Sequence, residues 1–347
     1  MPKTKIAIAL LAVLTAMLSA AFSVRYYWIL APEPFESPRL VAIERGERFR
    51  TVAAALARAG VVRSATAMVL YGELTGQARQ IKPGDYEFRG GERIPDVMRH
   101  LVSGDFVVIT VVVPEGLDID GIAERLQLAG LACQGDFERA ARRGPVVRAL
   151  GLEPLGAEGF LFPATYRFSP RVSPNEVLEA MLARFYQVLT PRVEERMFAL
   201  GLTARQLVTM ASIVEKEAKV AGERPLIASV FYNRLRRGMP LQSDPTAEYS
   251  VQGQASSAAT AVRIPSEFNT YARAGLPPGP IANPGLRSID AALYPAQSEF
   301  LYFVARDDGT HVFSRSFDEH RRTIAALKRS AARSGSPPKP LVVRRAN

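Results

Sequence analysis

Two glutamates stand two positions apart in an otherwise apolar segment, and they are the strongest candidates for chemistry in the chain. The segment 207–220 is apolar over most of its helical circumference, which predicts a buried helix. Successive residues of a helix are about 100° apart, so Glu215 and Glu217 lie about 160° apart and cannot serve one cleft as a pair. A carboxyl in an apolar wall is costly to ionise, so its pKa rises and it can act as a general acid near neutral pH.

The helical wheel favours Glu217 as the enclosed carboxyl, because it lies beside Val214 inside the apolar arc. Glu215 lies at the other margin and is the alternative. A structural role is also open, in which a buried glutamate is neutralised by Arg224 or Arg234 and serves only the fold.

Three neighbouring segments must position this helix. Thr203 and Gln206 have the spacing of a capping box, which starts the helix. A further helix is predicted to end at Gly238, and a polar turn follows at 241–246. Its Gln, Ser, Asp and Thr side chains are suited to sugar hydroxyls and equally to plain turns. The Pro- and Gly-rich segment 275–285 is predicted to form a rigid rim.

Helical and strand-like segments alternate along the chain, which predicts an α+β fold. Near the N-terminus the order is strand, helix, helix, strand. The run 107–113 is β-branched and predicts a buried strand, and segments 301–305 and 311–314 flank an Asp-Gly hairpin turn. The predicted organisation is a cytoplasmic stub and membrane anchor (1–30), a Pro-rich linker (31–39), a small binding-type module (40–106), a catalytic domain (107–327) and a basic disordered tail (328–347).

The N-terminus predicts export. The run 6–24 carries no charge and spans about 28 Å as a helix, close to the apolar thickness of a bilayer. Lys3 and Lys5 precede it and should stay in the cytoplasm, and aromatic residues 26–28 follow where an interfacial belt is expected. A cleaved signal peptide, cut near residues 19–21, is the alternative. Both hypotheses place the rest of the chain outside the cytoplasm.

Charge and composition exclude several classes of function. The net charge is +10, but residues 321–347 contain eight basic residues and no acidic ones, so the excess is concentrated in the tail. A nucleic-acid partner is therefore not expected. One cysteine, Cys133, excludes an intramolecular disulfide, and three histidines in no ligand spacing predict no metal site.

Several ordered motifs resemble the endolytic murein transglycosylase (MltG/YceG-like) family. The central ones are Ala-Ser-Ile-Val-Glu-Lys-Glu-Ala at 211–218, Ser-Val-Phe-Tyr-Asn-Arg-Leu at 229–235 and Gly-Met-Pro-Leu-Gln-Ser-Asp-Pro-Thr at 238–246. The match continues at 158–166, 269–271, 275–281 and 302–305. Ala164 stands where the family usually has Asp. The resemblance covers roughly residues 40–327.

The resemblance implies a single-pass protein of the bacterial inner membrane, with a cytoplasmic N-terminus, a LysM-like module and a periplasmic catalytic domain. The implied reaction cuts the MurNAc-β-1,4-GlcNAc bond of nascent peptidoglycan and leaves a 1,6-anhydro-MurNAc end, without a cofactor. The implied acid/base is Glu217, with Glu215 as the alternative. A lone carboxyl suits this chemistry, because the C6 hydroxyl of the sugar replaces the second carboxylate that a hydrolase requires. Glycan strands, the membrane and a peptidoglycan synthase are the implied partners.

Six residues are candidates for the sugar-binding wall, each with a plain turn or packing role as its alternative. They are Gln242, Ser243, Asp244, Thr246, Asn233 and Tyr271. Two competing functions remain: a two-carboxylate muramidase hydrolase with Asp244 as the second acid, and a non-catalytic peptidoglycan-binding scaffold.

Overall fold

The computed structural model describes residues 8, 11–23, 35–251 and 257–333, whose contacts divide the chain into two compact units. The first comprises residues 1–109 with 167–171, and the second comprises 110–166 with 172–347. Within the described part, no single helix is long and apolar enough to span a membrane. Leu11–Ser23 is a shorter apolar helix, and the predicted span 6–24 includes positions outside the described residues.

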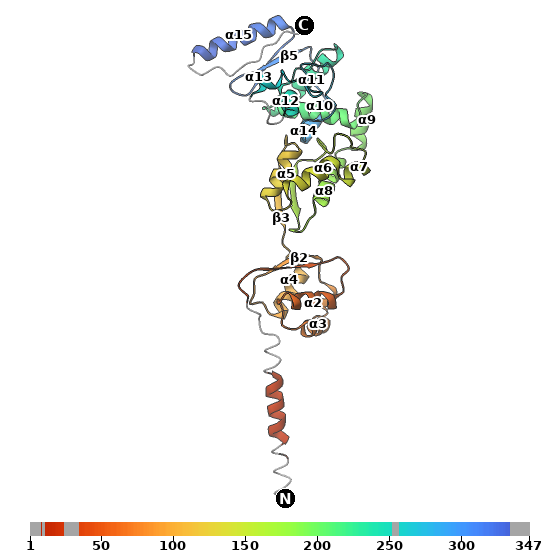
Figure 1. The fold of residues 1–347 in the computed structure, drawn as a ribbon, viewed down its shortest axis with the longest axis vertical. Helices are drawn as coiled ribbons and strands as arrows, with labels where there is room; N and C mark the ends of the chain where they lie inside the picture. The colour runs from red at the N-terminus through yellow and green to blue at the C-terminus, as the bar shows by residue number, and fades with distance from the viewer. Residues whose placement is uncertain (1–7, 9–10, 24–34, 252–256, 334–347) are drawn as a thin grey trace. The chain divides into compact units, whose positions relative to one another are not determined.

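The first unit has the predicted order of strand, helix, helix and strand (Figure 1). Its elements are β1 (Arg39–Ile43), α2 (Phe49–Arg58), α3 (Ala65–Leu74), the 3-10 turn η1 (Gln77–Arg79), β2 (Gly84–Phe88) and α4 (Ile94–Ser103). Strands β1 and β2 pair antiparallel, with Val41 opposite Tyr86. The side chain of Ser64 caps α3 by accepting a hydrogen bond from the Ala67 N–H at 3.2 Å, as its position before the helix predicts.

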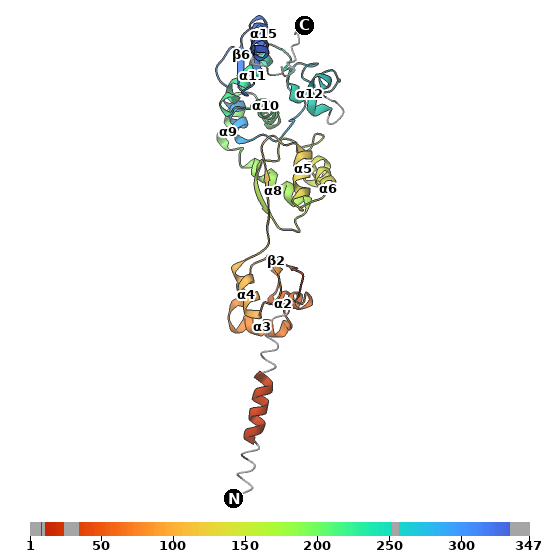
Figure 2. The same cartoon turned by 90° about the vertical axis from the view of Figure 1, so that its left-hand side faces the viewer.

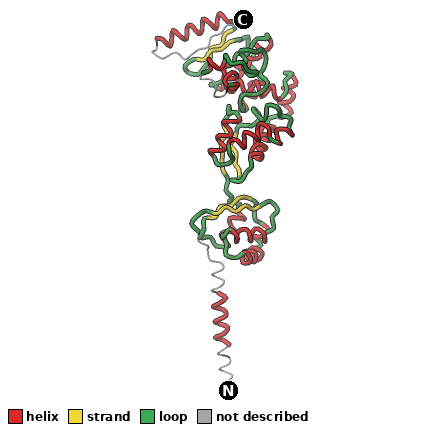
Figure 3. Tube along the Cα trace, viewed as in Figure 1, coloured by secondary structure: helices red, strands yellow, loops and turns green. Residues whose placement is uncertain are grey.

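One apolar core holds this unit together. Figure 3 shows the two strands along one side of the unit and the helices against them. Alternate strand residues point to the helices, because successive side chains of a strand face opposite ways. The strand residues of the core are Val41, Ile43, Tyr86 and Phe88, and they pack with Val52, Leu56, Met68, Val97, Met98 and Leu101 from the helices.

The second unit is predominantly helical and contains two small sheets. Its first half comprises β3 (Ile109–Val113), α5 (Ile119–Leu128), α6 (Gln134–Arg143), α7 (Pro145–Ala149), β4 (Ala164–Phe168), α8 (Pro174–Tyr186) and α9 (Pro191–Ala199). Its second half comprises α10 (Ala204–Glu217), η2 (Ala221–Glu223), α11 (Arg224–Arg236), α12 (Asp244–Ser250), α13 (Ala258–Ala261), α14 (Leu286–Leu293), β5 (Tyr302–Ala305), β6 (His311–Ser314) and α15 (Phe317–Arg333). Strand β3 pairs with β4, and β5 pairs antiparallel with β6.

Helix α10 is the central element of the second half. Figures 1 and 2 show it among α11, α12 and α14, each of which it contacts. Every residue from Leu207 to Val214 is buried, as expected for a helix that is apolar on all sides. The capping box forms as predicted: Thr203 Oγ1 accepts from the Gln206 N–H, and Gln206 Oε1 accepts from the Thr203 N–H.

The structure corrects several sequence-based boundaries. Helix α10 ends at Glu217, three residues before the predicted end. The predicted polar turn at 241–246 already contains the first turn of α12, and α15 continues to Arg333, so the tail from 328 begins as helix. Residues 334–347 lie outside the described part. Helices α7, α12, α13, α14 and α15 and strand β4 were not predicted; all of them except α15 are short, with eight residues or fewer.

Two predicted environments are also wrong. Strand β3 is buried on one face only: Val111 and Val113 are buried, whereas Val112 is exposed. A two-stranded sheet with one covered face leaves alternate residues in solvent. The predicted rim at 275–285 is wrong for residues 279–285, which are all buried, whereas Gly275 and Leu276 are half-buried and Pro278 is exposed.

Gly159 packs so closely against Pro280 and Val208 that a side chain there should destabilise the protein. Its φ is +84°, and a Cβ there would lie 2.4 Å from a Pro280 carbon and 2.7 Å from a Val208 carbon. We expect Gly159→Ala to lower the free energy of unfolding by about 3 kcal/mol or more, because backbone strain adds to a steric clash. The control is Gly201→Ala, where φ is +65° with open space around the added carbon, and the expected cost is about 1 kcal/mol. Urea unfolding measures the free energy of unfolding of both variants. Equal losses would contradict the close packing of Gly159 against Pro280 and Val208.

Candidate active site

Glu217 is the last residue of α10 and is half-buried. Its pKa is raised from 4.5 to about 7. Burial is the main cause, and the charges of Asp244 and Glu248 act in the same direction, whereas the Ser243 hydrogen bond and the charge of Arg234 lower the pKa. The C-terminal end of a helix carries partial negative charge, which also disfavours a carboxylate there. This carboxyl can therefore exchange a proton near neutral pH.

The two oxygens of the Glu217 carboxyl have different surroundings. The Ser243 hydroxyl donates a hydrogen bond to Oε1 at 2.6 Å. Among the described residues, Oε2 has no hydrogen-bond partner. The proton of the neutral acid therefore belongs on Oε2, where it is free to be transferred.

Ser243 is itself held from both sides. Its N–H donates to Thr270 Oγ1 at 3.1 Å, and its carbonyl accepts from Thr246 Oγ1 at 2.7 Å. The two threonine hydroxyls also lie 2.7 Å apart, and all three residues are buried. Thr246, a predicted sugar contact, is thus placed behind Ser243 and orients it. Thr270 belongs to a motif of the family resemblance but was not predicted as a site residue.

Asp244 and Tyr271 form a second pair beside this group. The Tyr271 hydroxyl donates to Asp244 Oδ1 at 2.6 Å. Burial is the main cause that raises the pKa of Tyr271, followed by this hydrogen bond. Asp244 lies in the first turn of α12, where the helix dipole favours its negative charge. The structure thus brings two of the predicted sugar contacts together.

Gln242 and Asn233 are both engaged in contacts with the protein. Gln242 Oε1 accepts from Arg234 Nη1 at 3.0 Å. The side-chain amide of Asn233 donates to the carbonyls of Ser298 and Phe300, at 2.9 and 2.8 Å. Asn233 therefore anchors the segment before β5, as a helix-packing residue does.

Glu215 is fully paired. Its Oε1 accepts from Arg224 Nη2 at 3.0 Å, and its Oε2 accepts from Ser288 Oγ at 2.7 Å and from the Gly285 N–H at 3.1 Å. The side chains of the ion pair are 8% and 11% exposed, so water screens them little. The structural role that the sequence left open for either glutamate is found at Glu215, with Arg224 as the partner.

Glu158 is a third buried carboxyl, and sequence reasoning assigned it no role. Its Oε1 accepts from Asn283 Nδ2 at 3.0 Å, and its Oε2 accepts from the Ile119 N–H at 3.1 Å and from the Tyr249 hydroxyl at 3.3 Å. Burial raises its pKa to about 8. Asn283 also bonds the Leu117 carbonyl and the Leu161 N–H. The group joins four segments distant in sequence, which makes it a structural junction.

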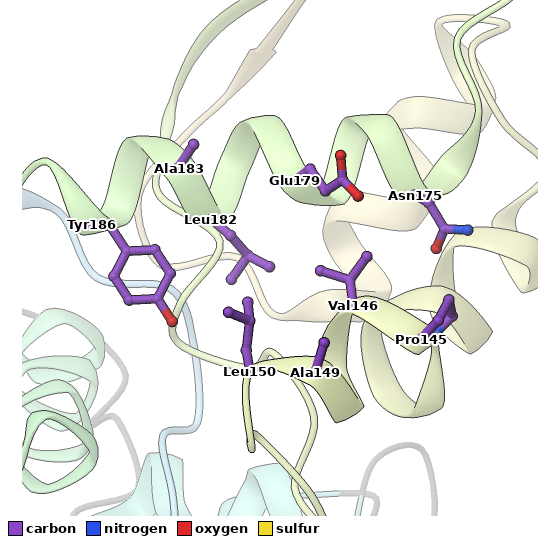
Figure 4. Close-up of a pocket in the computed structure, with 9 residues that line it drawn as sticks. All are labelled: Pro145, Val146, Ala149, Leu150, Asn175, Glu179, Leu182, Ala183 and Tyr186. Atoms are coloured by element: carbon purple, nitrogen blue, oxygen red, sulfur yellow. The ribbon is translucent and has the colours of Figure 1, made fainter.

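A separate cavity of about 530 Å³ lies between α7 and α8 (Figure 4). It is mainly apolar, with Val146, Leu150 and Leu182 in its wall and Asn175 at one end. None of the residues around Glu217 lines it. In the described part of the chain, no group of three or more His, Cys, Asp or Glu side chains is placed to hold a metal ion.

The different partners of the two glutamates predict opposite effects on stability. We expect Glu215→Gln to lower the free energy of unfolding by about 3 kcal/mol, because Arg224 is left as an uncompensated buried charge. Glu217→Gln should be neutral or stabilising at pH 8, since it removes a carboxyl that burial makes costly to ionise. The exposed pair Arg50–Glu73 is the control, where Glu73→Gln should cost less than about 1 kcal/mol. Urea unfolding at pH 8 tests all three variants. A greater loss of unfolding free energy in Glu217→Gln than in Glu215→Gln would mean that Glu217, and not Glu215, is the structural carboxyl.

The raised pKa of Glu217 also predicts a pH dependence. A group whose pKa rises on folding from 4.5 to about 7 contributes stability fully below pH 4.5, and that contribution is lost as the pH rises through 7. Relative to Glu217→Gln, the wild type should lose about 3 kcal/mol between pH 4.5 and 8. Subtracting the variant's curve removes the contribution of Glu158, which titrates in both proteins. Parallel curves over this range would mean that Glu217 has an ordinary pKa.

Comparison with known proteins places the chain in a family. The model of the YceG-like family matches residues 41–326. An endolytic murein transglycosylase of Bacillus subtilis is 32% identical, over 81% of this chain and 82% of that protein. One from Streptococcus pneumoniae is 30% identical, over 90% of this chain and 63% of that protein. The crystal structure of a YceG-like protein from Listeria monocytogenes, 29% identical, superposes with a TM-score of 0.58 over 83% of this chain and 100% of that one. Because the family model and these relatives match most of its length, the chain belongs to the YceG-like family.

Proposed function

We propose that this protein is an endolytic murein transglycosylase, which cuts the MurNAc-β-1,4-GlcNAc bond within peptidoglycan strands and leaves 1,6-anhydro-MurNAc ends. The observation that carries the proposal is the carboxyl of Glu217, whose pKa is raised to about 7 mainly by burial and whose Oε2 has no hydrogen-bond partner among the residues that the structure describes. The names of the relatives from Bacillus subtilis and Streptococcus pneumoniae support the same activity.

In the proposed mechanism Glu217 acts twice. First, Oε2 donates its proton to the glycosidic oxygen as the bond from C1 of MurNAc to that oxygen breaks, and the bonding electrons leave with the oxygen. The Glu217 carboxylate then takes the proton of the C6 hydroxyl of the same sugar while O6 attacks C1. No water is consumed, and the acid is restored. A pKa near the working pH suits a group that must serve as acid and as base.

Neighbouring charges support the bond-breaking step. Asp244 and Glu248 lie close enough to raise the pKa of Glu217. The same negative charges stabilise the positive charge that develops at C1 as the bond to the leaving oxygen breaks. Ser243 positions the acid through its hydrogen bond to Oε1.

The sugar-binding wall consists, in our proposal, of Gln242, Asp244 and Tyr271. These three side chains are only partly buried. Asp244 and Tyr271 lie close enough to Glu217 to interact with its charge, and Gln242 directly precedes Ser243 in the chain. Thr246 and Asn233 have a supporting role, because Thr246 orients Ser243 and Asn233 anchors the segment before β5.

We extend the proposal to the organisation of the chain. Residues 40–106 form a LysM-like module and 107–327 the transglycosylase domain; the order of β1, α2, α3 and β2 supports the first assignment. The segment 6–24 anchors the protein in the inner membrane with a cytoplasmic N-terminus and a periplasmic catalytic domain, and the apolar helix Leu11–Ser23 is consistent with this. A peptidoglycan synthase that supplies nascent strands is the proposed partner.

Product masses from purified glycan strands test the proposal. The wild type should release anhydro-ended fragments, and Glu217→Gln should reduce the rate by about a hundredfold or more. Asp244→Asn should still give anhydro ends at a reduced rate, because Asp244 is not the nucleophile in this mechanism. Products heavier by one water, lost in Asp244→Asn, would instead identify a two-carboxylate hydrolase. Native turnover by both Glu217→Gln and Glu215→Gln would mean that neither glutamate of α10 is the catalytic acid. No turnover by the wild type would leave only a non-catalytic scaffold.

A further inference from the structure

Arg234 of α11 is a buried arginine that binds the turn leading to Ser243. Its Nε donates to the Leu301 carbonyl at 2.6 Å. Its Nη1 lies within hydrogen-bond distance of the Pro240 carbonyl at 3.1 Å, the Leu241 carbonyl at 2.9 Å and Gln242 Oε1 at 3.0 Å. One guanidinium thus fixes three consecutive residues of this turn and ties them to the start of β5.

The turn that Arg234 holds has a strained backbone. Gln242 has φ +54° and is the one non-glycine residue in the left-handed region within the described part of the chain. Side chains with a Cβ adopt this conformation at an energetic cost, so it persists only where surrounding contacts enforce it. Ser243, which binds Glu217, is the next residue, so the direction of its hydroxyl depends on that backbone conformation.

We propose that Arg234 is a positioning residue of the active site, which holds the strained turn 240–242 so that Ser243 presents its hydroxyl to Glu217. This inference rests on the proposed function of Glu217 and adds to it a residue that does not itself touch the reacting atoms.

The contacts require a guanidinium. Nε and Nη1 of arginine point in fixed directions and reach carbonyls of two different segments together, which the single ammonium of lysine cannot do. The Tyr302 ring packs against the guanidinium, with Cζ 4.9 Å from the ring centroid, and His320 stacks on Tyr302 with ring centroids 5.2 Å apart. Arg234 is therefore locked between β5 and the turn.

Arg234 also acts on Glu217 through its charge. The groups that interact with the Glu217 carboxyl include Ser243, Asp244, Glu248, Tyr271 and Arg234, and Arg234 is the cation among these five. Its positive charge lowers the pKa of Glu217, so removing the charge should raise that pKa. Geometry and charge can be separated, because lysine keeps the charge without the guanidinium contacts.

The experiment compares Arg234→Lys and Arg234→Met in glycan-strand turnover, with Arg237→Met as the control. Arg237 is an exposed arginine near the end of the same helix, and its variant should match the wild type. Both Arg234 variants should lower kcat at least tenfold with KM changed less than twofold. The basic limb of the pH–rate profile should move to higher pH in Arg234→Met and stay in place in Arg234→Lys.

Other outcomes would overturn the inference. Wild-type kcat in either Arg234 variant would show that the turn does not depend on the guanidinium, and a raised KM at unchanged kcat would make Arg234 a substrate contact. If both variants fail to fold, Gln242→Met removes one contact of Arg234; a kcat within twofold of wild type there would count against positioning. Glu217→Gln is measured in parallel: an inactive Glu217→Gln beside a fully active Arg234→Met rejects only this inference, whereas an active Glu217→Gln rejects the proposed function.

Discussion

The burial of one carboxyl at the end of one helix is the constraint on which the rest of the site depends. Helix α10 is buried from Leu207 to Val214, and Glu217 is its last residue, half-buried and close to Asp244 and Glu248. Full ionisation there is opposed by burial, by negative neighbours and by the helix dipole. The Ser243 hydroxyl offsets part of this cost. The result is a group that can both give and take a proton near pH 7.

Two glutamates on the same helix have different roles because their partners differ. Glu215 meets a guanidinium, a hydroxyl and a backbone N–H, so all its charge is compensated within the protein. Within the described part of the chain, Glu217 accepts a hydrogen bond from one hydroxyl, and its Oε2 has no partner. A compensated carboxylate stabilises a fold but has no proton to give. A single reactive acid also fits a reaction in which the substrate supplies its own nucleophile, as we propose.

Much of the fold follows from local patterns, whereas most of the site does not. The capping box at Thr203 and the apolar run that follows it predict α10, and the wheel selects Glu217. Periodicity could not show that α10 ends at Glu217. At this position the negative end of the helix dipole is a further cause that raises the pKa of Glu217. The contacts of Thr270 with Ser243 and of Arg234 with Gln242 join residues from separate segments. No spacing rule encodes such pairs, because tertiary packing creates them.

The most direct test of the central claim is a carbon-13 NMR titration of the glutamate side-chain carboxyls, in which Glu217→Gln identifies the resonance that belongs to Glu217. Our account predicts that this resonance titrates with a pKa of about 7, and that the basic limb of the pH–rate profile follows the same loss of a proton. A Glu217 resonance that titrates near 4.5, the ordinary value for glutamate, would mean that the carboxyl is ionised at neutral pH, and would contradict its role as the acid.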